Sequence, residues 1–391
     1  MRARILILML ASCTPTRPVV EPAELEARRE AFFEGIAAEA ADAAAVVRRR
    51  LERHANGDVA GAFDILILSG GGAKGAFGAG FLQGWSRDAG RPVHFDVVTG
   101  VSTGALLAPF AFVGTQDAIQ RVVDTYEEPK PDWVVSRTLS FLFQEKSYLD
   151  ASGLHRDLRA TMDEQLVRAV GEGHRDDRLL LIGTTDLDLG VMRTWNLTLL
   201  ADQGKQTRFE DVLLASSAIP GAFPPIEIDG NLYVDGGVSA QFVNGIDVHW
   251  VRTTLREIQS REPGWRVPPI RFWVIINNKL TVTPTTTRPT WPSVAGRSID
   301  VMIRQSMNFH RYSYILEARS LGRELGVPVE VRYVTIPNDH PEPAGKSFFD
   351  KEVMEGLVQL GRRMGADAKS WRREIDNPEY PHPHRTPLLK E

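Results

Sequence analysis

Short apolar runs recur along the chain, and glycines or polar residues end most of them. Runs of about four to eight apolar residues are typical of buried β-strands. The predicted strands are Ile65–Leu68, Phe95–Val98, Leu179–Gly183, Val191–Leu197, Leu232–Val234, Phe272–Ile276 and Val329–Ile336. Helical stretches lie between many of them, and strands that alternate with helices predict an α/β domain. We expect a three-layer α/β/α fold with a largely parallel central sheet, covered on both faces.

The residues before the first strand have a different pattern. Residues 24–53 are rich in Ala, Glu and Arg, which are strong helix formers. They predict one or two helices within an N-terminal segment, residues 23–58, which either packs on the main domain or serves as an arm for a partner. We expect the main domain over residues 59–375 and an irregular, proline-containing tail over residues 376–391.

The chain begins with the pattern of an export signal. Arg2 and Arg4 come before the apolar run Ile5–Leu10, and two small residues stand directly before Cys13. This predicts a signal peptide over residues 1–12. The run is too short for a transmembrane helix, which needs about 20 apolar residues.

The Leu-Ala-Ser-Cys sequence that ends at Cys13 resembles the lipobox of bacterial lipoproteins, in which the cysteine is lipidated. Acyl chains on Cys13 would anchor the protein to a membrane, with residues 13–22 as a tether. Thr14 after the cysteine resembles the signal for sorting to the outer membrane. We therefore expect a lipid-anchored protein of the bacterial cell envelope, on the outer membrane; the alternative is a lone, unmodified cysteine.

Composition excludes several function classes. Hydrophobic residues make up 43% of the 391 and charged residues 25%, a balance typical of a globular protein. The formal net charge of -4 offers no broad basic surface for nucleic acid. A single cysteine excludes an intrachain disulfide and a multi-cysteine metal site. His382 and His384 have no acidic or cysteine residue close by in the sequence, so we expect no metal site there.

One serine has the sequence context of a nucleophile. Residues 100–104 form the pattern G-x-S-x-G with Ser102 at its centre, between a predicted strand and the predicted helix Ala105–Val113. A sharp turn there would project the serine side chain above the sheet, and the flanking Gly100 and Gly104 permit such a turn. The helix N-terminus adds a partial positive charge that favours a developing oxyanion.

A glycine-rich loop follows the first strand. Gly70, Gly71 and Gly72 leave their backbone amides uncovered, and such donors can stabilise the anion of a tetrahedral intermediate. Lys74 adds positive charge, and Gly75 completes a pattern that also fits the dinucleotide-binding fingerprint. That alternative needs an acidic residue at the end of the second strand, whereas Asp88 precedes that strand.

An aspartate ends another strand. Asp235 directly follows the apolar run Leu232–Val234, and Gly236 and Gly237 come next, so this carboxylate can approach another loop closely. Many such aspartates only cap turns, and Asp235 alone would favour that interpretation.

The three motifs in this order resemble the patatin family of phospholipases. The resemblance extends to the segment before the aspartate, through Phe209–Val212, Ala215–Pro220 and Phe223–Pro225. It covers residues 63–237 clearly and residues 272–365 loosely. The chain departs from many members at Ser69, where they have aspartate, and at Lys74, where they have arginine.

The resemblance implies a function and a site. Members hydrolyse acyl esters of lipids with a Ser-Asp dyad on a three-layer α/β fold, without a cofactor or metal. It implies Ser102 as nucleophile, Asp235 as base, and the amides of Gly70, Gly71 and Gly72 as the oxyanion hole. The expected partners are a phospholipid or another acyl-ester lipid, and the membrane through lipidated Cys13.

Two alternatives remain at this stage. An α/β-hydrolase esterase with a Ser-Asp-His triad needs a histidine after its acid, and His249, His310 or His340 could serve by order alone. A non-catalytic envelope lipoprotein could keep the fold as a binding module. Aromatic residues around Trp133–Val135 and Leu139–Phe143 are either a lid or acyl-chain pocket, or an ordinary buried helix.

Overall fold

The computed structural model describes residues 20–88, 94–136, 149–243, 248–282, 284–341 and 349–373. The predicted signal peptide, Cys13, most of the tether, the aromatic run Leu139–Phe143 and the tail with His382 and His384 lie outside these residues.

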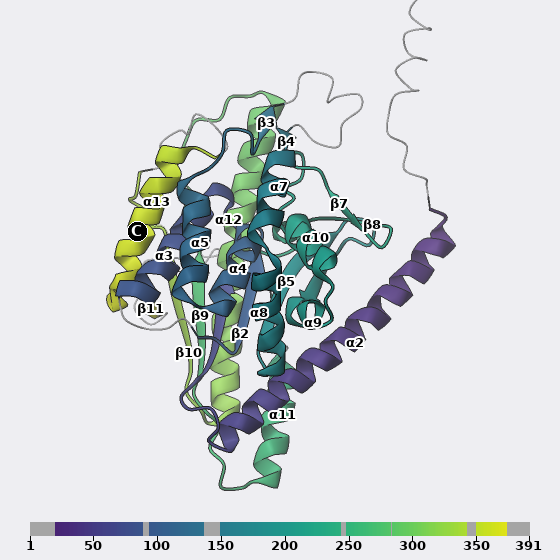
Figure 1. Ribbon diagram of the computed structural model, residues 1–391, viewed down its shortest axis with the longest axis vertical. Coiled ribbons are helices and arrows are strands. Elements are labelled where there is room, and N and C mark those ends of the chain that lie inside the picture. Colours follow the sequence, from purple (N-terminus) through teal and green to yellow (C-terminus); the bar gives the residue numbers. More distant parts are fainter. Residues whose placement is uncertain are drawn as a thin grey trace, which may run out of the picture.

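A nine-stranded sheet forms the centre of the molecule (Figure 1). Its strands are β1 (Phe63–Leu68), β2 (Val97–Val101), β5 (Leu179–Asp186), β6 (Val191–Asn196), β7 (Ile226–Ile228), β8 (Asn231–Asp235), β9 (Ile270–Ile276), β10 (Val329–Thr335) and β11 (Arg372–Arg373). Their order is β11-β10-β9-β1-β2-β5-β8-β7, and β6 pairs with β5. The five strands from β10 to β5 are parallel, and the outer pairings are antiparallel. The strand predictions are confirmed, as is the largely parallel sheet.

Helices cover both faces of this sheet. They are α2 (Pro22–Ala55), α3 (Gly75–Gln83), α4 (Thr103–Val113), α5 (Gln116–Glu127), α7 (Ser152–Thr161), α8 (Glu164–Arg175), α9 (Leu197–Asp202), α10 (Gln206–Ser216), α11 (Val248–Arg261), α12 (Trp291–Leu325) and α13 (Lys351–Ala366). A separate hairpin joins β3 (Val135–Ser136) to β4 (Leu149–Asp150).

Two hydrophobic cores show how the layers are divided. Along β1, Leu66 and Leu68 pack with α3, α4, α5 and α13, whereas Ile65 and Ile67 pack with α2, α11 and α12. Successive side chains of a strand point to opposite faces, so each face of β1 receives its own apolar pair. Burial on both faces explains why the central strands are almost continuously apolar, and it confirms the three-layer α/β/α architecture.

The N-terminal segment is one continuous helix, α2. Its C-terminal half packs on the domain through Ala43, Val46, Val47 and Leu51, while most residues of its N-terminal half are exposed. In Figure 1 the helix runs outward from the base of the sheet toward its N-terminal end. The prediction that this segment packs on the main domain is therefore confirmed for its second half.

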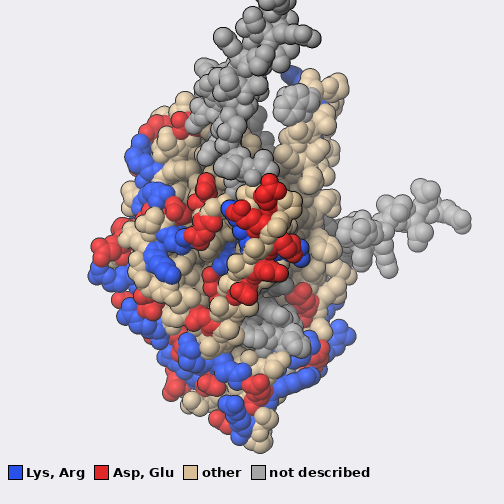
Figure 2. All heavy atoms as spheres, turned by 90° about the vertical axis from the view of Figure 1, so that its right-hand side faces the viewer, with Lys and Arg blue, Asp and Glu red and all other residues tan. Residues whose placement is uncertain are grey.

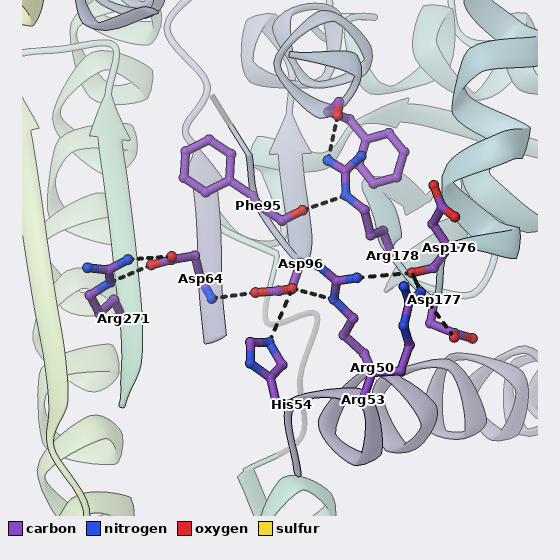
Figure 3. Close-up of polar contacts among 11 residues, drawn as sticks. Arg50, Arg53, His54, Asp64, Phe95, Asp96, Asp176, Asp177, Arg178 and Arg271 are labelled. Carbon is purple, nitrogen blue, oxygen red and sulfur yellow. Dashed lines mark hydrogen bonds and ion pairs between the residues drawn. The ribbon is translucent and has the colours of Figure 1, made fainter. Parts of the chain in front are cut away.

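Charged residues, among them the buried Asp96, join the end of α2 to the sheet (Figure 3). The Asp96 carboxylate accepts hydrogen bonds from Arg50 Nε at 2.5 Å and from the Asp64 amide at 2.7 Å. Arg53 donates to the Asp176 carbonyl at 3.1 Å. These contacts lie at the amino ends of the parallel strands, opposite the edge where Ser102 follows β2.

No helix among the residues that the structure describes combines the length and the apolar character needed to cross a membrane.

Candidate active site

Ser102 occupies a strained turn between β2 and α4. Its backbone has φ 56° and ψ −127°, a conformation that residues other than glycine rarely adopt. Strand β2 extends through Val101, so the turn is concentrated at Ser102 itself. A Cβ atom on Gly100 would lie 2.5 Å from the Gly104 carbonyl oxygen, and one on Gly104 would lie 2.3 Å from that of Leu68. The predicted strand-turn-helix context of the serine is confirmed, and close backbone contact explains both glycines.

Ser216 holds this turn in place. Its hydroxyl accepts a hydrogen bond from the Ser102 amide at 3.0 Å and donates one to the Gly183 carbonyl at 2.6 Å. The link joins the end of α10 to the turn and to β5. The sequence analysis gave Ser216 no separate role, although it lies in a segment that carries the family resemblance.

The sheet brings Asp235 to the same place as Ser102. Val101 pairs with Gly183 in the parallel ladder, and Thr184 pairs with Asp235 in the antiparallel ladder. Strand β5 therefore lies between the two residues and aligns them at one level. The Asp235 carboxylate accepts a hydrogen bond from the Gly237 amide at 2.7 Å, and the neighbouring Ser102 hydroxyl acts on its pKa.

The environment of Asp235 changes its acidity. Burial raises the pKa of its carboxyl to about 6, and the hydrogen bonds from Ser102 and the Gly237 amide only partly oppose this. The carboxylate therefore becomes mostly ionised above pH 6. An ionised carboxylate hydrogen-bonded to a serine hydroxyl can accept its proton.

The glycine loop lies against Ser102. A Cβ atom on Gly70 would be 3.1 Å from the Ser102 Cβ, and one on Gly71 would be 2.2 Å from the Asn277 carbonyl oxygen. None of the Gly70, Gly71 and Gly72 amides donates a hydrogen bond to another residue in the described part of the chain. The loop thus presents uncommitted donors beside the serine.

Side chains from distant parts of the sequence support this loop. Asn277 donates from its side-chain amide to the Ser69 carbonyl at 2.9 Å, and Ser69 Oγ accepts the Asn277 backbone amide at the same distance. Gln241 Oε1 would lie 3.1 Å from a Cβ atom on Gly70, and Gln241 Nε2 donates to the Gly237 carbonyl at 2.9 Å. Neither Asn277 nor Gln241 belongs to a motif, so the sequence analysis missed both.

The remaining motif residues also have structural explanations. Lys74 Nζ donates to Asn278 Oδ1 at 3.1 Å. Three glycines make close contacts: a Cβ on Gly75 would meet Thr103 Oγ1, one on Gly236 the Gly183 carbonyl, and one on Gly237 the Gln241 side chain. Asp88 ends the helical segment Gly84–Asp88 before β2, which is not the position that dinucleotide binding requires.

An apolar cavity opens beside Ser102 on the face of the sheet that α4, α5 and α7 cover. Its lining residues are Gly72, Ser102, Thr103, Leu106, Phe110, Val122, Thr125, Tyr126, Trp133, Leu154, Leu158, Thr161, Met162, Ser217, Ile219, Phe223 and Phe349. Trp133 is buried outside any helix and donates from Nε1 to Asp157 at 2.8 Å. Of the two predictions for this aromatic residue, the pocket is therefore the one that the structure favours.

A larger hollow under α2, lined by Arg28, Glu39 and Arg193 among others, shares no residue with this cavity.

No histidine is among the residues that line the cavity next to Ser102. His310 Nδ1 donates a hydrogen bond to the Ser306 carbonyl at 2.7 Å, within α12. The geometry therefore offers no support for a catalytic triad.

The fold and the site together define a class: an α/β/α domain with a serine at a strand-helix turn and a carboxylate on a neighbouring strand. Residues 66–243 match the family model described as patatin-like phospholipase. This part of the chain is a patatin-like phospholipase domain, and it contains Ser102 and Asp235. The match indicates a lipid acyl hydrolase.

Other comparisons add little. The crystal structure of VipD from Legionella pneumophila is similar over 77% of this chain and 67% of that chain, with 14% sequence identity and a TM-score of 0.30. No curated protein matches the chain.

Proposed function

We propose that the protein hydrolyses acyl esters of phospholipids or related lipids with Ser102 as nucleophile and Asp235 as its only base. One observation carries the proposal. Strand β5 aligns Ser102 with a buried carboxylate, Asp235, whose pKa is raised to about 6, next to an apolar cavity and a loop of uncommitted amides.

The chemistry proceeds in two steps. In the first, Ser102 Oγ attacks the ester carbonyl carbon while its proton passes to Asp235. The bond to the alcohol then breaks, and Asp235 returns the proton to the leaving oxygen, so that an acyl-serine remains. In the second step, water attacks the acyl-serine, gives its proton to Asp235, and the fatty acid leaves as the proton returns to Ser102 Oγ.

The glycine loop would stabilise both tetrahedral intermediates. In each one, the former carbonyl oxygen carries negative charge. The amides of Gly70, Gly71 and Gly72 and the N-terminus of α4 would face this charge without reorganisation, which is how preorganised donors lower a barrier.

Substitutions of the two residues test the dyad. Ser102→Ala should lower turnover of a soluble ester at least about a hundredfold, within the roughly million-fold scale of nucleophile loss in a serine hydrolase. A fluorophosphonate should label the wild type, which would separate an enzyme from a non-catalytic lipoprotein. The same probe should not label Ser102→Ala. Asp235→Asn should be similarly inactive. Substantial activity in a folded Ser102→Ala variant would refute the assignment.

A histidine scan separates the dyad from a triad. His155, His174, His249, His310 and His340 should each tolerate replacement by glutamine with most of the activity retained. A triad predicts that one of these variants is as inactive as Ser102→Ala. Circular dichroism of each variant excludes unfolding as the cause.

We also propose an envelope location for the protein, anchored through lipidated Cys13. The support is the sequence alone: two arginines, an apolar run and small residues before the cysteine. Mass spectrometry of the mature protein should find acyl chains on Cys13, and Cys13→Ser should prevent both lipidation and cleavage. An unmodified Cys13 in the wild type would exclude this anchor.

A further inference from the structure

Helix α12 extends far past the sheet that it covers. Arg304 donates to the Thr281 carbonyl at 2.9 Å, and Asn308 donates to the Leu280 carbonyl at 2.9 Å, so these residues lie level with the segment that directly follows β9. Residues 291–303 continue beyond that level for about 20 Å of helix. Figure 1 shows α12 rising past the tips of the strands. We call residues 291–303 the α12 extension.

The α12 extension projects at the edge of the sheet that holds the candidate active site. Strands β1, β2 and β9 are parallel, and Leu68 pairs with both Gly100 and Ile275. The carboxyl ends of these strands therefore meet at one edge. Asn277, which follows β9, touches Gly71 of the glycine loop. The chain returns along α12 from this edge, so the start of the helix is its most distant part.

Large apolar side chains are exposed on the α12 extension. Val294 is 48% exposed, Ile299 51% and Met302 68%. The charged residues within the extension, Arg297 and Asp300, bind each other at 3.2 Å, and Asp300 also binds Arg304. At the upper right of Figure 2, where α12 rises above the rest of the described chain, the surface is almost entirely tan. The solvent-facing side of a helix is normally polar or charged, so this apolar surface is suited to an apolar partner.

Further exposed apolar side chains lie near the same edge on other elements. Val238, 53% exposed, follows Asp235, Gly236 and Gly237, of which Gly237 contacts Gln241. Val135, 52% exposed, belongs to the hairpin whose Leu149 amide binds the Ala222 carbonyl, close to the cavity wall. A second copy that packed along α12 would leave these two residues uncovered, whereas a broad lipid surface can contact all of them.

We propose that the α12 extension docks onto the surface of a lipid bilayer, with Val294, Ile299 and Met302 entering the boundary between headgroups and acyl chains. The proposal rests on the proposed function, because an ester that is held in a bilayer must reach Ser102 at this edge. The paired charges of the extension fit a zwitterionic surface, which requires no cluster of basic residues.

The single cysteine of the chain allows a test at individual residues. In a Cys13→Ser background, Met302→Cys and Leu316→Cys each carry one environment-sensitive fluorophore. Leu316 is the matched control because it is 45% exposed on the same helix. It lies about 21 Å along the helix axis from Met302. Phosphatidylcholine vesicles should produce a blue shift and a severalfold rise in emission at position 302 and neither change at position 316.

Each other outcome overturns the proposal. No response at position 302 would exclude docking through the extension. Equal responses at both positions would mean that the whole side of the helix meets the lipid. A response that depends on protein concentration without vesicles would assign this face to a second copy of the chain.

A second set of variants measures the strength of docking. Ile299→Asp and Met302→Asp should each weaken partition onto these vesicles about tenfold, because each removes the burial of one large apolar side chain. Leu316→Asp should leave it unchanged, and all three should hydrolyse a soluble short-chain ester at the wild-type rate. Equal partition of all three variants would refute docking by the extension.

The two proposals fail in distinguishable ways. Ser102→Ala should keep the fluorescence response at position 302 although it cannot hydrolyse an ester. Loss of vesicle docking with normal turnover of the soluble ester would refute only the docking. Absence of any ester hydrolysis in the wild type, with docking intact, would refute only the proposed function.

Discussion

At Asp235, burial and hydrogen bonding act on the same proton in opposite directions. Burial dominates and raises the pKa of the carboxyl to about 6. A general base works best when its pKa lies near the working pH but low enough that the ionised form predominates. The pKa of the Asp235 carboxyl meets both conditions at neutral pH.

The pH dependence of turnover follows from this pKa. Because only ionised Asp235 can accept the Ser102 proton, kcat/KM for a soluble ester should rise with pH, reach half its maximum near pH 6, and then remain level through pH 8. Steady-state kinetics over this range checks the expectation. An inflection that disappears in one of the histidine variants would instead identify a histidine as the base.

Asp235 should also lower the stability of the folded protein at neutral pH. Its folded pKa lies above the ordinary value of 3.8, so the folded state holds the proton more tightly than the unfolded chain does. The resulting stability is present below the unfolded pKa and is lost as the pH rises through about 6. Asp235→Asn cannot ionise. Relative to the wild type, its free energy of unfolding should therefore increase by up to about 3 kcal/mol between pH 4 and pH 7.5.

Urea denaturation of both proteins at the two pH values measures this difference. Ser102→Ala is a suitable control because it keeps the carboxyl. A difference between Asp235→Asn and the wild type that stays constant with pH would contradict the raised pKa.

At the scale of the elements, helix α2 is attached to the sheet in part through the buried carboxylate of Asp96. Burial alone would raise the pKa of Asp96, but the His54 imidazole 3.6 Å away, the Arg50 guanidinium and the Asp64 amide together hold it below its ordinary value. Figure 3 shows these groups converging on one carboxylate where α2 meets β1 and β2. The helix is thus attached at its C-terminal half by apolar contacts and by this cluster together.

Asp96→Asn should weaken that attachment strongly. Removal of one partner leaves the half-buried Arg50 guanidinium without its counter-charge, and loss of such a partner from a buried pair typically costs about 3 kcal/mol of unfolding free energy. Glu26→Gln on the same helix is the matched control, since Glu26 is 59% exposed and pairs with Arg29 at the surface. The control should change stability by about 0.5 kcal/mol or less. Urea denaturation gives both values, and equal effects would show that the Asp96 cluster contributes no more than a surface pair.

At the scale of the whole molecule, the cavity is the feature that no single segment contains. Its walls come from the glycine loop, α4, α5, α7, Trp133, the segment after α10 and Phe349. An acyl chain bound there would contact side chains that are more than two hundred residues apart in the sequence. The accepted chain length is therefore a property of the assembled domain.

A bulky residue in this cavity should shorten the accepted acyl chain. Leu158 is buried in α7 and lines the cavity, so Leu158→Trp should lower kcat/KM for long-chain esters about tenfold or more and leave a short-chain ester nearly unaffected. Ala160→Trp adds the same side chain to an exposed position of the same helix and should change neither. A series of p-nitrophenyl esters of increasing length measures both. Unchanged selectivity in Leu158→Trp would place the acyl chain elsewhere.

The sequence by itself determined the features that depend on neighbouring residues. The apolar runs predicted every long strand of the sheet, because burial on both faces demands such runs. The turn at Ser102 was predictable because G-x-S-x-G between a strand and a helix describes a local backbone conformation. Asp235 was predictable only through its resemblance to a family motif, since an aspartate at the end of a strand more often caps a turn.

Tertiary structure alone decided the rest. The pairing of Asp235 with Ser102 depends on the order of β2, β5 and β8, which no local pattern specifies. Ser216 and Asn277 support the site through hydrogen bonds across long sequence separations, and their residue types are common in any loop or helix end. The raised pKa of Asp235, the apolar cavity and the projection of α12 past the sheet likewise follow from packing, because each depends on which surfaces the folded chain covers and which it leaves exposed.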